Sequence, residues 1–159
     1  MTVLFVCHAN TARSVMAQAL LEKLLAERAP GHAIRVRSGG VAPYARDGML
    51  ASLDARLALR EVGVHLGEDA VTSTDLKAHP ELLTGADLIL TMTARQKEML
   101  AAFPEARGKT VLSLREFAGE AGDIADPAGQ GEDVFRACLG EIKRCLEGSL
   151  ERLLGTGRG

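Results

Sequence analysis

The chain has 159 residues, of which 47% are hydrophobic and 25% are charged, so it can bury one ordinary core but not two. Its net charge of −2, with the basic residues scattered along the sequence, gives no reason to expect a nucleic-acid partner or an anionic membrane surface. No apolar run reaches the roughly 20 residues of a membrane span and the amino terminus shows no export signal, so we expect one cytoplasmic domain over residues 1–159.

The first half of the chain alternates predicted strands and helices. Thr2–Cys7 is a short, continuous apolar run, which is typical of a parallel strand buried on both faces. After a polar break, apolar side chains recur at helical spacing over residues 14–28. Residues 34–38 alternate as a second strand that ends at two glycines, and residues 48–61 have the pattern of a second helix.

The second half continues this alternation. Residues 86–91 and 110–114 are predicted strands, and residues 94–102 between them are predicted to be helical. Residues 131–154 carry an apolar stripe at helical spacing and form the last predicted helix. Strands and helices that alternate at these lengths predict an α/β domain with a parallel sheet and helices on both faces.

Ligands in such folds bind outside the carboxyl ends of the strands. The breaks that follow the first and fourth predicted strands, residues 8–13 and 115–131, both emerge at that edge of the sheet. We therefore expect the functional site to combine residues from these two segments.

Residues 7–14 read Cys-His-Ala-Asn-Thr-Ala-Arg-Ser and have the pattern of a phosphate-binding loop. A loop this tight turns backbone N–H groups inward, and the helix that follows adds partial positive charge, so a phosphate can be bound without a metal. Arg13 adds a planar fork for two phosphate oxygens, and Asn10 tolerates a left-handed backbone. The same groups favour the thiolate of Cys7, and Ser14 can donate its hydroxyl to the sulfur. The predicted phosphate-binding residues are His8, Ala9, Asn10, Thr11, Ala12, Arg13 and Ser14.

A cysteine followed six positions later by an arginine is a weak pattern when it stands alone, because Cys7 could simply be a buried thiol at the end of a strand. The buried strand before it, Asn10 within it, and Ser14 with an amphipathic helix after it favour the phosphate-binding interpretation.

Phosphoryl transfer to sulfur also needs a proton donor for the leaving group. Asp126, followed by Pro127, lies after the fourth strand, where a carboxyl group partly buried beside a phosphate could hold a proton. Asp123 is the other candidate, but no proline follows it. An Asp-Pro pair can equally serve only to open a turn.

Two segments carry the likeness of a known family: VLFVCHANTARSVMAQ at residues 3–18 and GDIADPAG at residues 122–129, with weaker support from SGGV at 38–41 and ADLILTMT at 86–93. They resemble the low-molecular-weight protein-tyrosine-phosphatase family, including its bacterial protein-arginine-phosphatase branch. The resemblance covers nearly the whole chain. It implies a flavodoxin-like three-layer sandwich with a four-stranded parallel sheet and a phosphocysteine intermediate. By this likeness the catalytic residues are Cys7, Arg13 and Asp126.

The chain also departs from that family. Ala9 stands where a glycine is usual, Ala12 where a second cysteine is usual, and residues 15–18 read Val-Met-Ala-Gln instead of Pro-Met-Ala-Glu. Losing the second cysteine removes a protective disulfide that relatives can form, so the resemblance implies that the thiol at residue 7 is easily over-oxidised.

The resemblance also bears on the substrate, which we expect to be a phosphorylated protein or a small phosphorylated molecule. Tyrosine-directed relatives carry aromatic residues just after Asp-Pro, where this chain has Ala128 and Gly129, and Thr11 matches the arginine-directed branch. This favours phosphoarginine over phosphotyrosine, although that branch also often keeps an aromatic residue at position 128. Tyr44 and Ala128 are candidates for the pocket wall, but Tyr44 could equally be an exposed loop residue.

Two other functions fit parts of this pattern. Arsenate reductases share the loop, and Cys138 and Cys145 could form a thiol relay, but their spacing places both on the apolar stripe of the last helix, which favours core packing. A non-catalytic phosphate-binding module is the other alternative, and the presence of both Cys7 and Asp126 argues against it. The dispersed histidines and cysteines match no metal-ligand spacing, so neither a metal nor a cofactor is expected.

Overall fold

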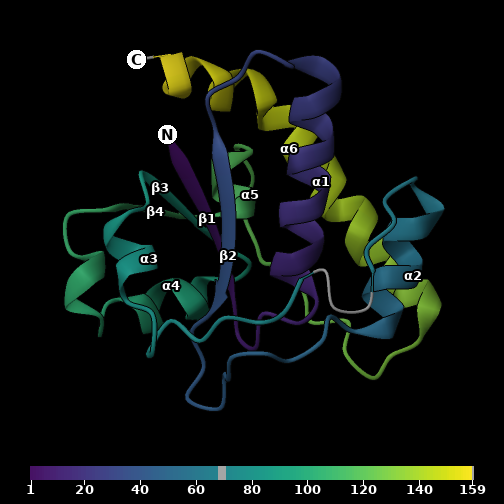
Figure 1. Cartoon of the computed structure of the whole chain (residues 1–159), viewed down its shortest axis with the longest axis horizontal. Helices are drawn as coiled ribbons and strands as arrows, with labels where there is room; N and C mark the ends of the chain where they lie inside the picture. The colour runs from purple at the N-terminus through teal and green to yellow at the C-terminus, as the bar shows by residue number, and fades with distance from the viewer. Residues whose placement is uncertain (68–70, 159) are drawn as a thin grey trace.

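The computed structural model describes residues 1–67 and 71–158, and four parallel strands form its central sheet in the order β2-β1-β3-β4 (Figure 1). The register aligns the carboxyl ends of the strands, because Cys7 is paired with Gly40 and Thr91 with Ser113. The loops that follow the strands therefore gather at one edge. The strands are β1 (Thr2–Cys7), β2 (Arg35–Gly40), β3 (Leu88–Thr91) and β4 (Thr110–Ser113).

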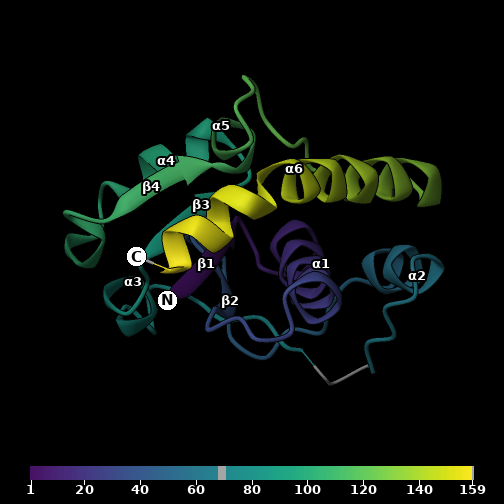
Figure 2. The same cartoon turned by 90° about the horizontal axis from the view of Figure 1, so that it is seen from above.

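Helices connect the strands and cover both faces of the sheet, as the views in Figures 1 and 2 show. The longest, α6, packs against α1, α2 and α5, whereas α3 and α4 lie on the other side of the sheet. The helices are α1 (Arg13–Arg28), α2 (Leu53–Glu61), α3 (Glu81–Thr84), α4 (Ala94–Leu100), α5 (Leu114–Phe117) and α6 (Glu132–Arg158), with a 3₁₀ turn η1 at Pro104–Ala106.

Side chains alternate along β1 between two hydrophobic cores. Val3 and Phe5 belong to the core beneath α1 and α6, and Leu4 and Val6 belong to the core beneath α3 and α4. Since successive strand residues point to opposite faces, a continuous apolar run is what a strand covered on both sides requires. This is why the sequence Val-Leu-Phe-Val fits only the interior of the sheet.

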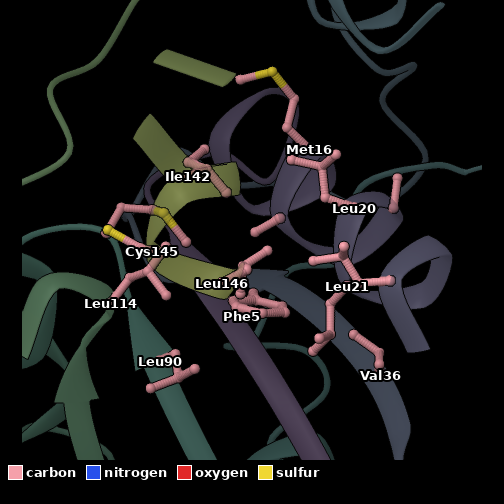
Figure 3. Close-up of a cluster of buried hydrophobic side chains, with 14 of the residues drawn as sticks. Phe5, Met16, Leu20, Leu21, Val36, Leu90, Leu114, Ile142, Cys145 and Leu146 are labelled. Atoms are coloured by element: carbon pink, nitrogen blue, oxygen red, sulfur yellow. The ribbon is translucent and has the colours of Figure 1, made fainter. Parts of the chain in front are cut away.

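The larger core is shown in Figure 3. Phe5 of β1 lies there among Leu21 of α1 and Leu146 of α6, all almost fully buried. Burying such side chains stabilises a fold by about 1.5–3 kcal/mol each, which fixes α1 and the loop before it on the end of β1.

The parallel sheet with helices on both faces confirms the predicted flavodoxin-like α/β fold. The predicted helix is wrong for residues 48–52, which belong to other contacts. Leu50 forms an isolated antiparallel bridge with Thr72, and the Ser52 backbone N–H donates to the Thr11 carbonyl at 2.8 Å. These residues therefore brace the phosphate-binding loop before α2 begins.

None of the helices in residues 1–67 and 71–158 combines the length and the apolar character that crossing a bilayer demands. Residues 68–70 and 159, which are part of the domain expected over residues 1–159, lie outside the described residues.

Candidate active site

A tight loop joins β1 to α1 at the lower edge of the sheet in Figure 1. Asn10 has a φ of +60°, the left-handed conformation expected there. The carbonyl oxygens of Cys7 and His8 accept hydrogen bonds from the backbone N–H groups of Val41 and Ala42, each at 3.0 Å. In a trans peptide the N–H points away from the carbonyl, so the N–H groups of His8 and Ala9 point away from the end of β2.

The end of β2 approaches this loop more closely than a side chain would allow. A Cβ atom at Gly40 would lie 2.9 Å from the His8 carbonyl oxygen and 3.0 Å from the Ala9 carbonyl carbon. Glycine at this position therefore allows the backbone of β2 to pack directly against the backbone of the phosphate-binding loop.

Hydrogen bonds join the side chains around the Cys7 sulfur into one network. Cys7 Sγ lies 2.9 Å from Ser14 Oγ and accepts the Asn10 backbone N–H at 3.3 Å. The Asn10 amide donates to Ser14 Oγ at 2.7 Å and accepts the Thr74 backbone N–H at 2.9 Å. Because Asn10 donates to the Ser14 oxygen, the Ser14 hydroxyl hydrogen is free to point at the sulfur and donate a hydrogen bond to it.

Arg13 opens α1, and its side chain is only 4% exposed. Its Nη1 donates to the Ile124 carbonyl at 2.7 Å, while its Nη2 lies 3.4 Å from His8 Nδ1 and 3.9 Å from Asp126 Oδ2. The guanidinium thus joins the phosphate-binding loop to the segment that precedes α6. A buried cation at this point can bind an anion that enters the loop.

Asp126 lies at this meeting point, with its side chain 58% exposed, and its partial burial beside a bound phosphate stays a prediction. Its Oδ1 accepts the Ala128 backbone N–H at 3.0 Å, which orients the carboxylate. Asp123 is used differently: its Oδ1 accepts the Ala94 backbone N–H at 2.9 Å, at the start of α4. Of the two candidate acids, Asp126 is the one that faces Arg13.

The sequence did not identify one contributor to this site, Gln96 of α4. Its Nε2 lies 2.7 Å from His8 Nδ1, although α4 and the phosphate-binding loop are far apart in the sequence. Gln96 forms a capping box with Thr93, a Thr-x-x-Gln pattern that is visible in the sequence but does not reveal the contact with His8.

The two candidate wall residues lie in different places. Tyr44, 66% exposed, lines a pocket of about 490 Å³ together with Ala9 and Thr11 of the phosphate-binding loop. Ala128 is not among the residues that line this pocket, and it contacts Asp126 through its backbone.

Cys138 and Cys145 lie in the core of the larger face, as the helical stripe predicts, and Figure 3 shows Cys145 beside Leu114. Burial raises the pKa of Cys138 to about 11 and also raises the pKa of Cys145. Both are therefore thiols at neutral pH and poor nucleophiles. Within residues 1–67 and 71–158, no three His, Cys, Asp or Glu side chains gather closely enough to hold a metal ion.

The sequence matches the family model described as low molecular weight phosphotyrosine protein phosphatase over residues 2–156. The chain belongs to this family. As a low-molecular-weight phosphatase it is a cysteine-dependent enzyme, and the position of Cys7 at the end of β1 fits a phosphocysteine mechanism.

Individual proteins that are similar to this phosphatase are also named as protein phosphatases. It is 40% identical over 153 residues, 95% of each chain, to a protein-arginine-phosphatase of Geobacillus stearothermophilus. It is 33% identical over 142 residues, 89% of this chain and 92% of the relative, to a low molecular weight protein-tyrosine-phosphatase of Staphylococcus haemolyticus. Its fold matches that of a YwlE arginine phosphatase mutant with a phosphorylated active-site serine, with a TM-score of 0.85, 34% identity and coverage of 96% and 95%.

Proposed function

We propose that this phosphatase removes phosphate from phosphorylated arginine in proteins, using Cys7 as nucleophile, Arg13 as phosphate ligand and Asp126 as acid and base. The observation that carries the proposal is the meeting of the two loops, where Arg13 Nη2 lies 3.9 Å from Asp126 Oδ2. Arg13 follows the phosphate-binding loop, which begins at Cys7, and the Cys7 sulfur forms a hydrogen bond with Ser14. This geometry supports the assignment of an anion ligand, a nucleophile and a proton donor to one edge of the sheet.

In the first step, the Cys7 thiolate attacks the phosphorus atom. The bond from phosphorus to the leaving nitrogen or oxygen breaks, its electron pair stays on that atom, and Asp126 supplies the proton. The inward backbone N–H groups of the loop and the Arg13 guanidinium hold the phosphoryl oxygens while their charge is redistributed. Because these donors are fixed before the substrate arrives, little reorganisation is needed during the reaction.

In the second step, water attacks the phosphocysteine, and Asp126, now a carboxylate, accepts its proton. The bond between phosphorus and sulfur breaks, inorganic phosphate leaves, and the sulfur departs as a thiolate. Ser14, 2.9 Å from Cys7 Sγ, stabilises the departing thiolate by donating its hydroxyl hydrogen.

Three features support phosphoarginine as the preferred substrate. The 40% identical relative from Geobacillus stearothermophilus is a protein-arginine-phosphatase. Thr11 places a hydroxyl in the pocket beside the loop, and Tyr44 is the one aromatic residue of that lining. A phenol ring gains most from aromatic walls, whereas a guanidine needs hydrogen-bond acceptors, such as a threonine hydroxyl oxygen.

We also propose that residues 1–159 form one phosphatase domain that acts on phosphorylated proteins in the cytoplasm and needs neither metal nor cofactor. The phosphate-binding loop with Arg13 supports binding of the anion by protein groups alone.

The test is turnover of two peptides of the same sequence, one with phosphoarginine and one with phosphotyrosine. We expect a higher kcat/KM for the phosphoarginine peptide, and loss of about 10⁴-fold or more with both peptides in Cys7→Ser. Cys138→Ser is the matched control, since its buried thiol takes no part. Equal rates on the two peptides would refute the substrate preference, and activity retained in Cys7→Ser would refute the mechanism.

A further inference from the structure

The His8 imidazole lies between two groups that can only donate hydrogen bonds to it. Gln96 Oε1 already accepts the backbone N–H groups of Met92 at 2.8 Å and Thr93 at 3.1 Å. The amide of Gln96 is therefore oriented with its Nε2 toward His8 Nδ1, at 2.7 Å. Since Gln96 is completely buried, this orientation cannot be exchanged for one stabilised by water.

The second donor is Arg13, whose Nη2 lies 3.4 Å from the same His8 nitrogen. A guanidinium has no acceptor, so both neighbours require His8 Nδ1 to be unprotonated. The imidazole is then neutral and carries its proton on Nε2.

The charges around the ring favour the same form. Burial, the positive charge of Arg13 and that of Arg95 on α4 lower the pKa of His8 below its ordinary value of 6.5, while Asp126, in the loop before α6, acts in the opposite direction. These are the charged groups of α1, α4 and the α5–α6 loop that act on the ring.

Arg13 Nη2, the atom that lies near His8 Nδ1, is also near Asp126. Two acceptors lie near this nitrogen, His8 Nδ1 at 3.4 Å and the Asp126 carboxylate at 3.9 Å. A closer ion pair between Arg13 and Asp126 would occupy the phosphate ligand and the proton donor together. A second acceptor for Nη2, such as His8 Nδ1, weakens that ion pair by competing for the same nitrogen.

We propose that His8 is a positioning residue for Arg13: its unprotonated Nδ1 competes with the Asp126 carboxylate for the guanidinium, and protonation of the ring releases Arg13 toward Asp126. The proposal rests on the proposed function, in which Arg13 binds the phosphate. In protonated His8 the Nδ1–H would point at the Gln96 Nε2–H, so two donors would face each other and the ring would have to move away from Gln96.

Three substitutions separate this role from a purely structural one. His8→Asn keeps an acceptor oxygen close to the position of Nδ1 but cannot be protonated. His8→Ala removes the acceptor. Gln96→Glu keeps the two backbone hydrogen bonds of the side chain but turns a carboxylate oxygen toward His8, which favours the protonated ring. His65→Asn, at an exposed histidine after α2, is the matched control.

The first measurement is binding of inorganic phosphate at pH 7.5 by titration calorimetry. We expect His8→Ala to weaken binding about fivefold, the effect of losing one positioning hydrogen bond, and His8→Asn to recover most of that loss. Equal binding by wild type and His8→Ala would overturn the proposal. This readout needs no turnover, so it stays informative even if the proposed phosphatase reaction fails.

The second measurement is kcat/KM on 4-nitrophenyl phosphate from pH 5 to pH 8. The ratio of His8→Asn to wild type cancels the ionisation of the substrate and of the other active-site groups. We expect this ratio to rise about fivefold toward pH 5, and Gln96→Glu to shift the acidic decline upward by about one pH unit. A ratio that stays flat, or that rises equally in His65→Asn, would overturn the proposal.

Discussion

The loop between β1 and α1 and the loop before α6 meet at Arg13, but they are held in place differently. In the first, Asn10 and Arg13 are almost completely buried, and hydrogen bonds join each side chain to its neighbours. In the second, the Asp126 carboxylate is 58% exposed and is oriented by its own turn, through the Ala128 backbone N–H.

This difference matches the two chemical tasks that we propose. A group that binds an anion works best when it is fixed before the substrate arrives, because moving dipoles during the reaction costs free energy. A group that gives a proton in one step and takes one in the next has to reach water between the two. The buried loop suits the first task, and the exposed carboxylate suits the second.

Asp126→Asn should produce the largest effect on this comparison. Without an acid for the leaving group, we expect kcat on phenyl phosphate to fall by roughly 10²–10⁴. The loss should be smaller on 4-nitrophenyl phosphate, because nitrophenolate leaves readily without a proton. Steady-state kinetics on both substrates measure the difference.

The control for that variant is Asp123→Asn, in the same loop but bonded to the start of α4. It should lower kcat less than tenfold and equally on the two substrates. If Asp126→Asn slowed both aryl phosphates to the same extent, the aspartate would not be protonating the leaving group.

Ser14→Ala tests the buried side of the comparison and should have an intermediate effect. A hydrogen bond to a charged group contributes about 1.5–3 kcal/mol, so losing the donor to the thiolate should slow turnover roughly tenfold to a hundredfold. Alkylation of Cys7 by iodoacetamide at pH 6 should slow as well. Ser149→Ala is the matched control: Ser149 is also buried, but its hydroxyl donates within α6 to the Cys145 carbonyl. Unchanged alkylation in Ser14→Ala would contradict the role of the hydroxyl.

The smallest effect concerns the outer support of the phosphate-binding loop. His79 Nε2 lies 2.7 Å from Asp47, whose other oxygen accepts the Asp75 backbone N–H next to the segment bonded to Asn10. The hydrogen bond to Asp47, and then that to Glu81, raise the pKa of His79 above 6.5. A raised pKa stabilises the fold fully below pH 6.5, and this stabilisation is lost as pH rises through the higher value in the folded state.

His79→Asn should therefore lower the melting temperature at pH 6 and have a vanishing effect toward pH 9. The His79 side chain is 40% exposed, so solvent screens its ion pairs and we expect a difference of no more than about 3 °C at pH 6. Differential scanning calorimetry at the two pH values measures it, and a difference that grew with pH would show that the sign of this linkage is wrong.

The sequence was sufficient to predict the sheet, because β1 and β3 are apolar runs and the start of β2 alternates polar and apolar residues before two glycines. It also predicted the loop around Cys7, whose residues are contiguous. The start of α2 was mispredicted because residues 48–52 are fixed by contacts with Thr72 and Thr11. Both partners are at least 20 positions away in the sequence. Local periodicity contains no such information.

Asp126 was preferred to Asp123 because the turn residue Pro127 follows it, and the structure brings Asp126 within 3.9 Å of Arg13, while its role stays a prediction. The contact between Gln96 and His8 was not predicted, because it joins residues 88 positions apart. The short helix α5 was missed although Ser113 and Glu116 form a capping box that the sequence displays as Ser-x-x-Glu. It was missed because a single turn of helix has no periodicity to detect.

Asn10 meets several demands that no other residue type satisfies together. Glycine can adopt its backbone angle but offers no side chain, and aspartate could accept the Thr74 N–H but would have no hydrogen to give Ser14. Mutational tolerance should therefore be very low at this position, whereas Tyr44, exposed in the pocket beside the loop, should tolerate more substitutions. The residues that select the substrate can then change faster than the phosphate-binding loop, so a new specificity can arise while the catalytic residues stay the same.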